Sequence, residues 1–132
     1  MIHVKNLSKN INGHIIFQDV NIDISEGELI AITGPSGCGK TTLLNILGLI
    51  DDDYTGTYQF ENVQNIKSNT HQSQKIIREK INYLFQNFAL IDNETVFNNL
   101  KLALKYVKLS KSEKRKMITT MLEEVGLAHK ID

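Results

Sequence analysis

The segment Gly34–Thr41 reads Gly-Pro-Ser-Gly-Cys-Gly-Lys-Thr and constrains the fold of this chain more than any other feature. It fills the template of a phosphate-binding loop: a glycine, four further residues and Gly-Lys-Ser/Thr. A triphosphate needs backbone N–H donors at a helix N-terminus, and glycine lets the backbone approach it closely. The segment therefore predicts a strand, a loop and a helix that hold a nucleoside triphosphate.

The loop residues have distinct expected roles. Lys40 is expected to reach the β- and γ-phosphates, the Thr41 hydroxyl to ligate Mg²⁺, and Thr42 to donate one more hydrogen bond. Cys38 lies beside a helix N-terminus, which favours the thiolate, so bound nucleotide is expected to block its alkylation. The predicted binding residues of the loop are Gly34, Ser36, Gly37, Cys38, Gly39, Lys40, Thr41 and Thr42. A glycine-rich turn without a ligand is the plain alternative.

The segments around the loop have the pattern that it requires. Residues 27–33 read as a turn and a short apolar strand, as expected for a buried central strand, and residues 41–47 have an apolar helical face. A second core strand is predicted at 81–85, ending at Gln86. These segments predict an α/β core.

An antiparallel β layer is expected before the loop. Residues 2–7 alternate apolar and polar side chains, residues 15–24 continue in β-favouring types, and an Asn-Gly pair supplies the turn between them. One more strand is predicted at 55–60. It follows three aspartates at 51–53, which we expect to be a solvated loop rather than a cation site.

The rest of the chain predicts helices. A polar surface loop runs into a short helix at 74–79, and apolar residues follow helical spacing over 96–107. A capping-box pattern at Ser110–Glu113 opens a further helix, which Gly126 ends. Its apolar stripe, expected to be core, consists of Met117, Ile118, Met121, Leu122 and Val125.

Composition excludes several classes of protein. Fifteen basic and fifteen acidic residues among 132 sum to zero, which gives no electrostatic footprint for nucleic acid or anionic lipid. A single cysteine excludes an internal disulfide and suits a reducing compartment. The N-terminus is no signal peptide, and no stretch approaches the roughly 20 apolar residues that cross a bilayer. We expect one domain or part of one, in the cytoplasm, that binds no nucleic acid.

The β layer, the loop with its helix, and the strand that ends in Gln86 together resemble the nucleotide-binding domain of ABC transporters, over the whole chain. The resemblance implies an α/β fold: a P-loop NTPase three-layer core with an antiparallel β layer and a partial helical subdomain. Residues 1–91 would be the N-terminal part of the ATP-binding core subdomain, and residues 92–132 the start of the helical subdomain. The sequence is most similar to the branch that exports lipoproteins, macrolides or bacteriocins.

ATP and Mg²⁺ are the ligands that the resemblance implies. Gln86 would join Thr41 in the Mg²⁺ shell and help sense the γ-phosphate, since a neutral amide oxygen ligates a metal without adding charge. A polar strand terminus is the plain alternative for Gln86. Residues 87–91 would contact an integral membrane permease, and a second nucleotide-binding domain would complete a dimer. The protein would then lie at the inner face of the cell membrane through its partner subunits.

Two features depart from the family pattern. The family usually stacks adenine on an aromatic residue shortly after the first strand, where this chain has Ile11, and Phe17 is expected to be core. The signature motif, the strand ending in Asp-Glu (Walker B) and the switch histidine do not appear. We therefore identify no catalytic residue, expect an N-terminal part truncated before those motifs, and expect nucleotide binding without turnover.

Other functions fit less well. Asp92 and Glu94 follow an apolar run and resemble a Mg²⁺ and water-activating pair, but that run begins directly after Gln86, and Asp92 reads better as the start of a helix. A chromosome-maintenance ATPase needs sustained heptads, which residues 95–125 lack. An ATPase acting on the ribosome and a non-catalytic nucleotide-binding paralogue remain alternatives, whereas no candidate lid supports a small-molecule kinase.

Overall fold

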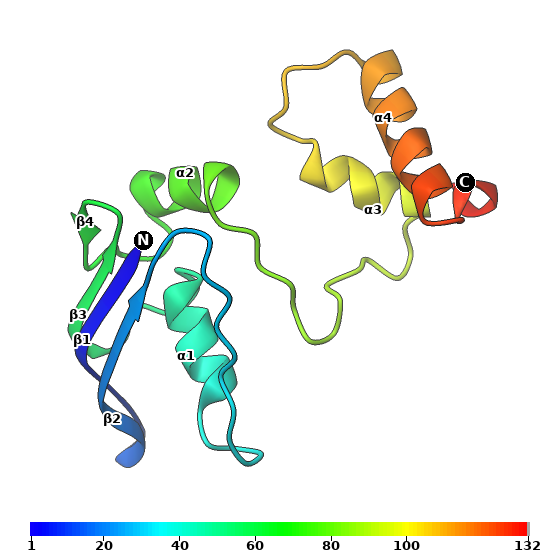
Figure 1. The fold of residues 1–132 in the computed structure, drawn as a ribbon. Helices are drawn as coiled ribbons and strands as arrows, with labels where there is room; N and C mark the ends of the chain where they lie inside the picture. The colour runs from blue at the N-terminus through cyan, green and yellow to red at the C-terminus, as the bar shows by residue number, and fades with distance from the viewer. Residues whose placement is uncertain (132) are drawn as a thin grey trace. The chain divides into compact units, whose positions relative to one another are not determined.

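The computed structural model describes residues 1–131. The chain divides into two compact units, Met1–Tyr83 and Leu84–Asp132. The elements in chain order are β1 (Ile2–Ile11), β2 (His14–Ile24), α1 (Lys40–Leu47), β3 (Thr55–Phe60), β4 (Val63–Gln64), α2 (His71–Glu79), α3 (Val96–Ala103), α4 (Lys111–Glu124) and the 3₁₀ helix η1 (Ala128–Lys130) (Figure 1).

The expected antiparallel layer is present in the first unit. Strands β1 and β2 form a hairpin whose two turn residues, Asn12 and Gly13, have φ of 51° and 83°. Positive φ at both positions matches the right-handed twist of the strands, which is why an Asn-Gly pair suits this turn. Strand β3 occupies the predicted residues 55–60, and the sheet order is β2-β1-β3-β4 with antiparallel pairing throughout.

A bulge in β1 decides which side chains reach the core. The register of β1 shifts between Val4 and Leu7, and Asn6 between them has φ of 50°. The extra residue turns both Val4 and Leu7 to the buried face, where strict alternation would expose one of them. Gly56 of the neighbouring strand has φ of 95°, and a Cβ there would collide with the Asn6 carbonyl, so the bulge requires a glycine opposite it.

Helix α1 packs its apolar face onto this sheet. Leu43, Ile46 and Leu47 of the helix share one buried cluster with residues of β1 and β3. The hydroxyl of Tyr58 on β3 donates to the Leu47 carbonyl at 2.8 Å, and burial raises the pKa of that phenol. The C-terminal end of α1 is therefore fixed to the sheet by packing and by a buried hydrogen bond.

Neither predicted core strand forms in residues 1–131. Residues 28–33 and 81–85 are irregular, and the side chains of Leu29 and Leu84 are 98% and 85% exposed. A central strand in a parallel sheet is held by ladder hydrogen bonds from its neighbours, and an isolated apolar run has no such stabilisation. The expectation of strands here is wrong for the described residues, because neither segment has a neighbouring strand among them.

The aspartates at 51–53 are not a simple solvated loop. The ammonium of Lys9, whose side chain is only 5% exposed, lies 2.8 Å from an Asp51 carboxylate oxygen and 3.2 Å from one of Asp53. Burial alone lowers the pKa of Lys9, but hydrogen bonds and the two negative charges outweigh it and raise that pKa above its ordinary value. Asp51 and Asp53 therefore pair with the buried ammonium group of Lys9.

The second unit contains α3 and α4. Helix α3 ends at Ala103 rather than near residue 107, and its N-cap is Thr95, so Asp92 does not start the helix. Helix α4 ends at Glu124, and Gly126 follows with φ of 74°.

The apolar stripe of α4 is buried only in part. Two of its five expected core residues, Ile118 and Leu122, are buried, while Met117, Met121 and Val125 are exposed. Within residues 1–131, no helix is long and apolar enough to cross a membrane.

Candidate nucleotide-binding site

Three glycines shape the predicted loop before α1. Gly34, Gly37 and Gly39 have φ of 153°, 80° and 93°, a region that other residues rarely adopt. A Cβ on Gly39 would lie 2.6 Å from Cγ2 of Ile16, and one on Gly34 would lie 2.8 Å from Sγ of Cys38. Positive φ favours glycine at all three positions, and close approach requires it at Gly34 and Gly39. That these glycines let the backbone approach a phosphate stays a prediction.

Helix α1 begins without a side-chain cap. Its N-cap residue is Gly39, in the left-handed conformation, and its first turn contains no acidic residue. Helices α2, α3 and α4, in contrast, are capped by the hydroxyls of Thr70, Thr95 and Ser110. The first N–H groups of a helix and its positive dipole end attract an anion, so the uncapped end of α1 is suited to bind a phosphate.

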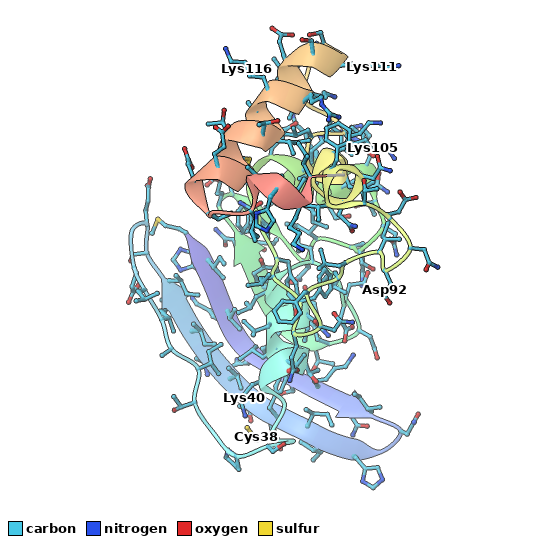
Figure 2. All side chains as sticks on the ribbon, turned by 90° about the vertical axis from the view of Figure 1, so that its right-hand side faces the viewer. Cys38, Lys40, Asp92, Lys105, Lys111 and Lys116 are labelled. Atoms are coloured by element: carbon cyan, nitrogen blue, oxygen red, sulfur yellow. The ribbon has the colours of Figure 1, made fainter. Side chains whose placement is uncertain are left out.

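The ammonium of Lys40 lies over this loop. Its Nζ donates to the carbonyls of Gly34 at 2.8 Å and Pro35 at 2.7 Å, and it lies 3.7 Å from Sγ of Cys38. Figure 2 shows Lys40 and Cys38 at the N-terminal end of α1. Three donors on one flexible side chain can turn from these carbonyls to phosphate oxygens. Protection of Cys38 by nucleotide stays a prediction, and its position beside Lys40 is consistent with it.

Thr41 is the loop residue that the sequence predicts as a ligand of Mg²⁺. Thr41 stands in the first turn of α1 and is exposed, and its hydroxyl forms no hydrogen bond among residues 1–131. Among the same residues, no cluster of three or more His, Cys, Asp or Glu forms a separate metal site. A hydroxyl of this kind suits Mg²⁺, which takes few protein ligands and keeps phosphate oxygens and waters.

Gln86 belongs to the second unit, in a turn after the irregular segment at 81–85. Its side chain is exposed, and its role as a metal ligand stays a prediction. No sequence signal indicated the role of Asn99, a residue of α3 whose side chain binds the backbone of Ile91. The N–H of Ile91 donates to Oδ1 of Asn99 at 2.8 Å, and Nδ2 of Asn99 donates back to the Ile91 carbonyl at 3.2 Å.

A cavity of about 390 Å³ lies beside the hairpin of the first unit. Phe17 and Tyr54 line it together with Lys9 and Asp53, whereas Ile11 does not. Phe17 also packs against the buried cluster, as expected of a core residue, and its ring approaches the loop, with Cδ1 3.2 Å from where a Cβ on Gly39 would stand. The aromatic side chains of this region therefore come from β2 and from the segment before β3.

Comparison with known proteins identifies the family. The model of the "ABC transporter" family matches residues 17–132. The chain belongs to the ABC transporter family. The macrolide export ATP-binding/permease protein MacB of Campylobacter jejuni is 37% identical over 132 residues, which are 100% of this chain and 21% of that protein. The methionine import ATP-binding protein MetN 1 of Enterococcus faecalis is 38% identical over 136 residues, 100% of this chain and 38% of that protein.

Solved structures confirm the fold class. The dimeric ATP-binding cassette MJ0796 in a post-hydrolysis state, bound to ADP and Pi, has a TM-score of 0.81 and 35% identity, over 93% of this chain and 56% of that one. The chain thus spans about half of the matched cassette and a fifth of MacB. It has an α/β fold of the P-loop NTPase class, of which the antiparallel layer, the phosphate loop and the helices are formed here.

Proposed function

We propose that this chain binds Mg-ATP at the Gly34–Thr42 loop. The observation that carries the proposal is the uncapped N-terminus of α1, which lies under a glycine-shaped loop with the Lys40 ammonium over it. The N–H groups of the loop would surround the phosphates, and Thr41 and Gln86 would hold the metal ion. The aromatic wall at Phe17 and Tyr54 would take over the contact to the base that Ile11 does not offer.

We further propose that the chain acts within an ATP-binding subunit that couples ATP binding and hydrolysis to export across a membrane. Relatives named for export and for import are about equally similar to this chain. The proposed direction of transport therefore rests on the Gln86-Asn87-Phe88 pattern rather than on sequence identity to either relative. Residues 87–91 would contact integral membrane permease subunits, and a second nucleotide-binding domain would complete the dimer. This arrangement would place the protein at the inner face of the cell membrane. The subdomain boundary after residue 91 belongs to the same proposal.

We expect binding without turnover by this chain. The loop supplies contacts for phosphate and metal, but the sequence offers no carboxylate identified as the activator of water. Asp92 and Glu94 are the candidate pair that the sequence offers for that role. The carboxylate of Glu94 accepts a hydrogen bond from Nδ2 of Asn98 in α3 at 2.7 Å. ATPase activity would then require the family's remaining motifs in addition to the residues of this chain.

Calorimetric titration with Mg-ATP, together with an assay of phosphate release, tests this proposal. Lys40→Ala is expected to weaken binding by about 100-fold or more, because charge-assisted hydrogen bonds to phosphate contribute about 1.5–3 kcal/mol each. Lys75→Ala is the matched control: it removes an exposed lysine of α2 and is expected to leave the affinity within about twofold.

Two results would contradict the proposal. Equal affinity of the wild-type chain and Lys40→Ala would show that the loop does not hold the phosphates. Sustained phosphate release by the wild-type chain would refute binding without turnover, and Asp92 and Glu94 would become the next residues to replace.

A further inference from the structure

Positive charge is concentrated in one part of the second unit. Residues 101–116 contain seven of the fifteen basic residues of the chain but a single acidic one, Glu113. The zero net charge of the chain argues against an electrostatic attraction to anionic lipid, but a sum over all 132 residues hides this local excess of positive charge. The inference from net charge is therefore too coarse for this region.

Three of these lysines meet at one cavity. The lysine pocket, a cavity of about 440 Å³ beside α3 and α4, is lined by Lys101, Lys105 and Lys114. Ile91 and Leu102 give it apolar walls, while Glu94 and Asn98 contribute polar groups. Three cations against one carboxylate leave the pocket with an excess of positive charge.

The three lysines of the pocket form no ion pair among the described residues. Among residues 1–131, none of the three ammonium groups lies within 4.0 Å of a carboxylate oxygen. Lys101 lies over the Phe97 ring and Lys105 over the Tyr106 ring, at 6.0 and 5.5 Å from the centroids. The one nearby acid of α4, Glu113, accepts hydrogen bonds from the Ser110 hydroxyl and N–H at its own cap. Like charges at one cavity repel, and a bound anion would relieve that repulsion.

The charges of α4 oppose its dipole. Lys111 and Lys114 occupy the first turn, where a helix favours negative charge, and only Glu113 there has the favourable sign. Glu123 and Glu124 end the helix, and its last turn has no basic residue. Each misplaced charge weakens the helix, so folding does not explain this arrangement. Departures of this kind are expected where a surface has a function.

Large apolar side chains lie among the lysines in sequence. Leu102, Tyr106 and Val107 are 53%, 64% and 41% exposed, and they lie between the lysines at positions 101, 105 and 108. Lysine stems with exposed aliphatic and tyrosine side chains are typical of protein surfaces at a membrane interface, where the charged groups meet lipid phosphates and the apolar groups enter the headgroup layer. The clustered ammonium groups are complementary to a phosphate, and the exposed apolar side chains near them favour a lipid headgroup over a free phosphate.

We propose that the lysine pocket binds the phosphate headgroup of an anionic phospholipid, so that the second unit contacts the membrane surface directly. Lys101, Lys105 and Lys114 would donate to the phosphate oxygens, and Leu102, Tyr106 and Val107 would enter the headgroup layer. Figure 2 shows Lys111 and Lys116 projecting to opposite sides of α4. The positive charges of this helix are therefore not all directed at a single partner. The proposal does not depend on nucleotide binding.

Co-sedimentation of the 132-residue chain with lipid vesicles, without nucleotide, tests the proposal. Vesicles of phosphatidylcholine with phosphatidylglycerol are compared with vesicles of phosphatidylcholine alone. Binding is expected only to the anionic vesicles and is expected to fall as salt rises. The triple variant Lys101→Gln, Lys105→Gln and Lys114→Gln is expected to bind about 100-fold more weakly, because each lysine near an anionic surface contributes about fivefold.

A second triple variant changes the net charge equally, away from the pocket. Lys5→Gln, Lys67→Gln and Lys75→Gln remove three lysines of the first unit and are expected to retain binding within a few-fold. Thermal unfolding checks both variants. The pocket variant is expected to be about as stable as the wild-type chain, because Lys114 opposes the dipole of α4 whereas Lys101 favours that of α3.

Three outcomes would overturn the proposal. The first is equal binding of the wild-type chain to both kinds of vesicle, or to neither. The second is an equal loss in the two triple variants, which would indicate net charge rather than a site. The third is binding of soluble glycerol phosphate or polyglutamate without binding of anionic vesicles, which would assign the pocket to a free phosphate ester or to an acidic protein.

Discussion

Helices α1 and α4 begin differently. Helix α1 has glycine at its N-cap and no side chain that accepts from its first N–H groups, whereas Ser110 and Glu113 form a complete capping box at α4. Helix α1 buries three apolar residues against a sheet, and α4 buries two of fourteen residues. Tertiary packing can therefore hold α1 while its N-terminus stays open to a ligand, and α4 depends more on local capping.

The largest expected difference between the two helices is in their buried residues. Ile46→Ala in α1 removes a side chain that is fully buried against the sheet, and it is expected to reduce the free energy of unfolding by about 2–5 kcal/mol. Met121→Ala in α4 removes a half-exposed side chain and is expected to cost about 0.5 kcal/mol or less. Chemical denaturation of both variants measures these values, and similar losses would remove the contrast.

Alanine substitutions at two glycines distinguish the effect of backbone strain on stability from its effect on ligand binding. Gly39→Ala is expected to cost about 1–3 kcal/mol and to abolish nucleotide binding, because φ is 93° and the new Cβ would meet Ile16. Gly126→Ala, after α4, meets no atom within 4 Å but has φ of 74°, so it is expected to cost about 1 kcal/mol and to keep nucleotide binding. Retained ATP affinity in Gly39→Ala, measured by calorimetry, would contradict the assigned loop geometry.

Loss of the α4 cap is expected to have a smaller effect. Ser110→Ala removes the hydroxyl that accepts from the Glu113 N–H and donates to its carboxylate, with an expected cost of about 1 kcal/mol. The change should appear in the helical signal of circular dichroism, with ATP affinity unchanged. A loss of ATP affinity in this variant would show that the two helix ends are not independent.

The smallest expected effect is a pH dependence of the same cap. Hydrogen bonds from the Ser110 hydroxyl and N–H hold the pKa of Glu113 below its ordinary value of 4.5. The cap thus contributes fully above that ordinary value and loses its contribution as pH falls through the lowered pKa. Glu113→Gln is expected to remove this acid dependence from the helical signal, and an unchanged pH profile in the variant would exclude Glu113 as its source.

Local sequence signals predicted the elements that depend on local interactions. The Asn-Gly turn, the strand at 55–60 and the capping box at Ser110 are set by neighbouring residues, and the structure confirms all three. The conformation of the phosphate loop also depends on local interactions, since each of its glycines is required by its own φ or by one close contact.

Features that depend on distant partners were not predictable in this way. The segments at 28–33 and 81–85 have apolar strand sequences, but a strand also needs a neighbour to pair with. The pairing of Lys9 with Asp51 and Asp53 joins positions more than forty residues apart, and nothing in either local sequence indicates it. The partial burial of α4 likewise follows from what packs on it, which helical spacing alone does not specify.

Backbone NMR during titration with Mg-ATP tests most directly the claim that the open N-terminus of α1 is the triphosphate site. Bound phosphates are expected to shift the amide resonances of Gly37, Gly39, Lys40 and Thr41 strongly, because these N–H groups would donate to phosphate oxygens. The amides of the capped first turn of α4, residues 111–114, serve as the internal control and are expected to stay unchanged. Saturable binding that leaves the four loop amides in place would contradict the account.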